Sequence, residues 1–174
     1  MAKPGTKILD GLSHYDTEND RIKIINQLYK MKEIGLKEIS SVTGFGFNSL
    51  KHAVISIDEF YNEDKINNLI NGDQSNLEES VSDVFIRTVE IGSILGYRLF
   101  EMNTDLMWCP AYPYWESPIY DFRTGLGLNV YHWAVKKFTE YGIDDGLDEK
   151  CIASIEYLKY AQQGDTLEPA SPAR

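Results

Sequence analysis

Apolar residues recur at helical spacing along most of this chain. Over about residues 17–34, five apolar residues would lie on one face of a helix: Ile24, Ile25, Leu28, Met31 and Ile34. An amphipathic α-helix has this period. The period continues over about 36–42, 49–70, 76–95, 99–106, 126–141 and 147–161. These segments predict an all-α fold, a helical bundle of about five to six helices.

Residues 107–122 differ in character from the helical segments. The stretch contains three prolines and six aromatic side chains. The prolines exclude a continuous helix, and the density of aromatic side chains argues against a free linker. We expect a Pro- and aromatic-rich extended segment that is pinned onto the helices or onto a second subunit.

The length of 174 residues suits one domain with a core of its own. We expect a single helical domain over 1–174, with an ordered core over about 17–161 and peripheral or mobile ends at 1–16 and 162–174. No apolar run approaches the ~20 residues of a membrane helix, and the start lacks the apolar region of a signal peptide. Neither Cys109 nor Cys151 belongs to a C-x-x-C pair. We therefore expect reduced thiols and a cytoplasmic protein.

The formal net charge of -10 disfavours binding to nucleic acid or anionic lipid. Residues 36–54 also fit a helix-turn-helix, a third functional hypothesis for the chain. The second helix of such a motif would offer only Lys51 and His52 before Asp58 and Glu59. Phosphate contacts come mainly from Arg and Lys, so DNA binding is the weakest of the three hypotheses.

Acidic residues concentrate on two neighbouring predicted helices. Glu59 and Glu63 are four residues apart, as are Glu79 and Asp83, so each pair would share a helix face. A turn at 71–73 would make the two helices antiparallel and bring the four carboxylates together. Like charges at close range need a counter-ion, and Mg²⁺ takes hard oxygen ligands while binding phosphates. The same spacing also occurs on solvated helix faces, so the pattern alone leaves both interpretations open.

The stretch from Gly72 to Glu90 carries a more specific signal. A Gly-Asp turn and a Glu-rich start lead into the order Asp-x-x-Ile-Arg-x-x-acid, here Asp83, Ile86, Arg87 and Glu90. This order resembles the second metal-binding helix of the MazG-like nucleoside triphosphate pyrophosphohydrolases. The resemblance covers residues 52–96, about a quarter of the chain.

The chain departs from the family's pattern in three places. Ser80 stands where the family has the Glu that precedes the Asp by three residues. The first motif of the family is Glu-x-x-Glu, whereas Asp58 and Glu59 lie five and four residues before Glu63. The basic, Asn-rich phosphate motif is not reproduced in residues 102–110, where Asn103 is its only candidate.

The resemblance implies a Mg²⁺-dependent enzyme, with Mn²⁺ as the alternative ion, that cleaves a nucleoside triphosphate into the monophosphate and pyrophosphate. It also implies a homo-oligomer, a dimer or higher. Four carboxylates would hold the metal and serve catalysis: Glu59, Glu63, Glu79 and Asp83. Two further acids are possible substitutes: Asp58 and Glu78. Arg87 and Asn103 are the weak candidates for substrate contact, and a structural pairing of Arg87 with Glu90 is the stronger interpretation of that arginine.

The departures from the motif favour a second hypothesis of a different class. The chain would then be a catalytically inactive MazG-like helical scaffold that acts as an assembly or interaction protein. The aromatic segment 107–122 would supply the apolar surface of an interface. On this hypothesis, replacing Trp108 or Trp115 with alanine lowers the oligomeric state or the solubility.

Overall fold

The structure is a computed structural model that describes residues 18–44, 46–75, 82–111, 113–139 and 146–161. These residues form six α-helices, one short 3-10 helix and a small three-stranded sheet, so the predicted all-α fold is confirmed. The helices are α2 (Glu18–Thr43), α3 (Leu50–Phe60), α4 (Glu63–Ser75), α5 (Asp83–Met102), η1 (Tyr114–Glu116), α6 (Val130–Lys137) and α7 (Leu147–Ala161).

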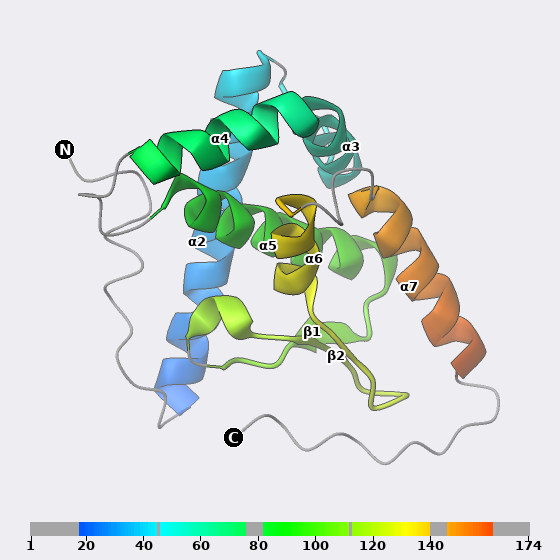
Figure 1. The fold of residues 1–174 in the computed structure, drawn as a ribbon. Coiled ribbons are helices and arrows are strands. Elements are labelled where there is room, and N and C mark those ends of the chain that lie inside the picture. The colour runs from blue at the N-terminus through cyan, green and yellow to red at the C-terminus, as the bar shows by residue number, and fades with distance from the viewer. Residues whose placement is uncertain (1–17, 45, 76–81, 112, 140–145, 162–174) are drawn as a thin grey trace.

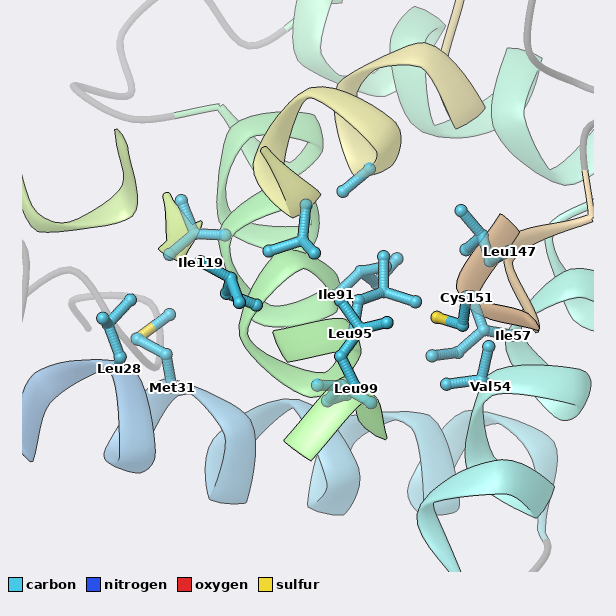
Figure 2. Close-up of a cluster of buried hydrophobic side chains, with 14 of the residues drawn as sticks. Leu28, Met31, Val54, Ile57, Ile91, Leu95, Leu99, Ile119, Leu147 and Cys151 are labelled. Atoms are coloured by element: carbon cyan, nitrogen blue, oxygen red, sulfur yellow. The ribbon is translucent and has the colours of Figure 1, made fainter. Parts of the chain in front are cut away.

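α5 is the central helix, and α2, α3, α4, α6 and α7 pack around it (Figure 1). Its residues are buried without interruption from Thr88 to Gly96, as expected of a helix that is covered on all sides. Figure 2 shows the core that results. The α5 side chains Ile91, Leu95 and Leu99 lie in the middle of this core. On one side they face Leu28 and Met31 of α2. On the other side lie residues of α3 and α7: Val54, Ile57, Leu147 and Cys151.

The segment 107–122 is pinned onto the helices by a small antiparallel sheet. Its strands are β1 (Leu106–Trp108), β2 (Ile119–Asp121) and β3 (Gly127–Leu128), in that order across the sheet. Side chains alternate between the two faces, so Leu106 and Trp108 are buried while Met107 is 49% exposed. The indole of Trp108 packs edge-on against Tyr97 and Phe100 of α5. The predicted attachment to the helices is thus confirmed.

Three predicted helix breaks are absent, and at two of them the glycine allows close packing against a neighbouring element. α2 continues through Gly35, where a built Cβ would lie 2.8 Å from the Cβ of Glu90. α5 continues through Gly96 to Met102, because Gly96 lies under the ring of Trp108. The predicted turn at 71–73 lies inside α4.

Two predicted helices are shorter than their apolar pattern suggested. The helix expected over 49–70 is two helices, because α3 ends at Phe60 and the Asn62 side chain accepts from the Lys65 N–H at the start of α4. The helix expected over 126–141 begins at Val130, after β3. α7 has the bounds that the sequence predicted.

Candidate functional site

Glu59 and Glu63 do not share a helix face, so that part of the prediction is wrong. Glu59 lies at the end of α3 and Glu63 is the first residue of α4. The chain changes direction between them, and both side chains are exposed. Two further predicted ligands, Glu78 and Glu79, lie in 76–81, outside the described residues.

Asp58 is already engaged in holding helices together. One carboxylate oxygen lies 3.2 Å from Nζ of Lys137, whose side chain is 3% exposed. The other accepts from the backbone N–H groups of Leu147 (2.8 Å) and Asp148 (3.4 Å), which caps the start of α7. Burial raises the pKa of Asp58, and Lys137 and the Leu147 N–H oppose that rise. These contacts give Asp58 a structural role between α3, α6 and α7.

Asp83 begins α5, and its position is set by α4. Both carboxylate oxygens of Asp73 accept backbone N–H groups, from Asp83 at 2.7 Å and from Val84 at 2.9 Å. The Ser82 hydroxyl accepts a third, from Phe85 at 3.0 Å. An anion at a helix N-terminus is favoured by the helix dipole and by the unpaired N–H groups there. Asp73 therefore ties the end of α4 to the start of α5.

One turn further along α5, the guanidinium of Arg87 joins two helices. Its Nη1 donates to Oε2 of Glu90 on the same helix, and its Nη2 donates to Oε2 of Glu38 on α2 at 3.3 Å. Asp83 lies close enough to Glu90 to interact with it electrostatically. Tyr61 lies similarly close to Arg87. We call these five side chains, Glu38, Tyr61, Asp83, Arg87 and Glu90, the Arg87 cluster.

The Arg87 cluster contains three carboxylates and one guanidinium. Burial of Glu90, which is 1% exposed, raises its pKa to about 7; Arg87 opposes the rise, whereas Glu38 and Asp83 add to it. Burial disfavours the charged form of Arg87, yet the neighbouring acids outweigh that effect and raise its pKa. Burial likewise raises the pKa of Tyr61 to about 12. The ion pair thus keeps Arg87 charged without fully offsetting the burial of Glu90.

Asn103 does not belong to this cluster. It is the C-cap of α5, and its side chain accepts from the Asp105 N–H at 2.9 Å. Asp83 and Asn103 stand at opposite ends of a helix of 20 residues, which is about 30 Å long. Within one chain, Asn103 is therefore too far from Asp83 for both residues to belong to one metal site.

Glu38 is the carboxylate of the cluster that the sequence pattern missed. It lies on α2, 49 positions before Arg87, and no motif or spacing joins the two. One signal was present, because Gly35 precedes Glu38 by three residues on the stretch where α2 approaches α5. A glycine inside an amphipathic helix indicates a close helix contact, although it does not say which helix is the partner.

Within the described residues, no group of three or more His, Cys, Asp or Glu side chains is arranged to hold a metal ion. In the same part of the chain, no helix combines the length and apolar character that a membrane crossing requires. Comparison with protein-family models, with curated proteins and with solved structures gives no match. The MazG-like resemblance therefore rests on the residues of α5 quoted above and stays a prediction.

Proposed function

We propose that the chain is a Mg²⁺-dependent nucleoside triphosphate pyrophosphohydrolase whose site lies at the Arg87 cluster. The supporting observation is that three polar residues of the MazG-like order, Asp83, Arg87 and Glu90, stand on α5, where Arg87 bonds both Glu90 and Glu38 of α2. The carboxylates of Asp83 and Glu38 are both within electrostatic range of Glu90. Three carboxylates around one guanidinium leave an excess of negative charge, which a divalent cation would neutralise.

Within the Arg87 cluster two carboxylates, those of Glu38 and Asp83, are only half-buried. They offer the hard oxygen donors that Mg²⁺ or Mn²⁺ prefers. Two carboxylates do not complete a metal site. Glu79, four residues before Asp83 in the sequence, is the proposed third ligand, with Glu78 as its substitute. A bound ion would polarise phosphate oxygens and help to deprotonate a water. Glu59 and Glu63 are left out of the proposed set because they are exposed on separate helices.

Arg87, Glu90 and, outside the cluster, Asp73 hold the proposed ligands in place. Arg87 is bound on one side by the buried Glu90, and through Nη2 it orients the carboxylate of Glu38. Asp73 holds the backbone of Asp83. The proposed roles are thus Glu38, Asp83 and Glu79 as ligands, Arg87 and Glu90 as their support, and a nucleoside triphosphate as the substrate.

Magnesium binding gives the first test. A divalent ion that binds only the folded protein should stabilise it by about 2.7 kcal/mol at a hundredfold excess over its dissociation constant. Asp83→Asn should abolish this gain, because the variant lacks one of the proposed carboxylate ligands. Thermal denaturation with MgCl₂, against NaCl of equal ionic strength, measures the effect. Glu63→Gln is the matched control and should keep the full response.

Activity is measured as pyrophosphate released from a panel of nucleoside and deoxynucleoside triphosphates with Mg²⁺. Wild type and Glu63→Gln should release it, and Asp83→Asn should not. No release by wild type, together with no magnesium binding by calorimetry, would reject the proposed enzyme.

The second candidate function is that of an assembly protein. Its interface would use a different surface from the predicted one, because the two predicted tryptophans are largely covered. Trp108 is 6% exposed, and Trp115 is half-buried against Phe85. The outward face of the sheet is instead apolar: Met107 pairs with Tyr120 across β1 and β2 and is 49% exposed, and Phe122 is 58% exposed. An exposed apolar patch of this kind favours a protein interface.

The assembly hypothesis predicts that the double change Met107→Ser/Phe122→Ser lowers the oligomeric state. Removing two apolar side chains from an interface weakens association, while the inward face of the sheet stays intact. Light scattering across a dilution series measures the mass. Tyr157→Ser on α7, where the side chain is 62% exposed, is the matched control. An equal mass for wild type and the double variant would exclude this face of the sheet as an interface.

A further inference from the structure

Two buried polar atoms, one in the Arg87 cluster and one on η1, lack hydrogen-bond partners among the described residues. They are Oε1 of Glu90 and Oη of Tyr114. Each side chain is 1% exposed, so bulk water does not reach either atom. A buried polar group without a partner costs free energy, and native proteins commonly satisfy such groups with an ordered internal water.

Tyr114 reaches this region from the segment 107–122. It begins η1, which contacts both α2 and α5. Its ring is held edge-on by Trp115, with 5.0 Å between the ring centroids. Burial raises the pKa of Tyr114, and the charge of Glu90 raises it further. The phenol and the carboxylate therefore lie within electrostatic range of each other, in surroundings that keep the phenol protonated and able to donate.

We propose that one buried water links the Tyr114 hydroxyl to Oε1 of Glu90 and makes Tyr114 a positioning residue for Arg87. The phenol donates to the water, and the water donates to Oε1. Oε2 of the same carboxylate receives Nη1 of Arg87, and Nη2 of Arg87 reaches Glu38. The chain of contacts thus runs from η1 through α5 to α2. The link is independent of the proposed function, whereas its importance for hydrolysis rests on that function.

Tyr114→Phe tests the link because it keeps the ring and removes only the hydroxyl. We expect Tm to fall by about 2–4 °C, the effect of one hydrogen bond in a chain of this size. We also expect the Arg87 side-chain N–H signals, assigned with Arg87→Lys in ¹⁵N-detected NMR spectra, to exchange with solvent several-fold faster. Tyr120→Phe, on the outward face of the sheet, is the matched control and should change neither quantity.

An unchanged Arg87 signal in Tyr114→Phe overturns the proposal, because the hydroxyl then does not support the guanidinium. A raised Tm also overturns it, since removing a hydroxyl that truly lacks a partner is stabilising. In the pyrophosphate assay the same variant should lower kcat about tenfold with KM unchanged, as loss of an outer support does. If wild type releases no pyrophosphate, the proposed function fails, while the NMR and Tm results still decide this inference.

Discussion

Gly96→Ala should lower the free energy of unfolding by about 3 kcal/mol, the upper part of the range for inserting a methyl group into a packed core. A Cβ at this position would lie 2.2 Å from Cζ2 and 2.3 Å from Cη2 of Trp108. The indole has no room to retreat, because Tyr97 and Phe100 pack against it. α5 and β1 would have to separate. Urea denaturation followed by circular dichroism measures the loss.

A second change identifies the clash as the cause. Trp108→Phe removes the part of the indole that contains Cζ2 and Cη2, so Gly96→Ala/Trp108→Phe should lose less stability than the sum of the single changes, by about 1 kcal/mol or more. Strict additivity would contradict the proposed clash. Gly72→Ala is the matched control: this glycine is exposed inside α4 with open space around it. There alanine should stabilise by up to about 1 kcal/mol through helix propensity.

Arg87→Met should lower the free energy of unfolding by about 3–5 kcal/mol at pH 8, the usual cost of removing one partner of a buried ion pair. The change leaves the carboxylate of Glu90 buried beside Glu38 and Asp83 without the guanidinium. The loss should be smaller at pH 5, where Glu90 is protonated. Chemical denaturation at both pH values measures the difference.

The pH dependence follows from the sign of the shift at Glu90. Its pKa is about 7 in the folded protein, against the ordinary glutamate value of 4.5, so the folded state binds more protons between these two pH values. The stabilisation from protonated Glu90 is complete below pH 4.5 and is lost as pH rises through 7, a change on the order of 3 kcal/mol. Glu90→Gln should flatten the stability profile over this window. A profile as steep as that of wild type would contradict the shift.

Two further variants test whether the loss of stability comes from breaking the buried Arg87–Glu90 pair or from removing any positive charge. Arg87→Met/Glu90→Gln should recover much of the stability lost in Arg87→Met, because no charged Glu90 is then left buried. Arg123→Met is the matched control. Arg123 is 43% exposed and pairs with Asp105 at 2.9 Å, so its loss should cost less than about 1 kcal/mol.

The residues that α5 contributes to the candidate site were predictable from the sequence, whereas the residue that α2 contributes was not. Asp83, Arg87 and Glu90 were identified from their order on one helix, and α5 does carry all three, with Arg87 bonded to Glu38 of α2. The first carboxylate pair was misplaced because Glu59 and Glu63 were assumed to share one helix. Asn62 caps a new helix there. The apolar period alone did not reveal the break, because both α3 and α4 continue a helical pattern.

The sequence by itself determined where most of the α-helices lie and which segment has none. Local rules suffice for this: apolar residues repeat at the helical period, Ser49 caps α3, and the prolines keep the described part of 107–122 out of any α-helix. Only the tertiary structure decided which surfaces meet. Glu38 reaches Arg87, the Trp108 ring covers Gly96, and Asp58 caps α7. These contacts depend on how whole helices pack, and helix packing is set by the combined shape and burial of side chains that are far apart in the chain.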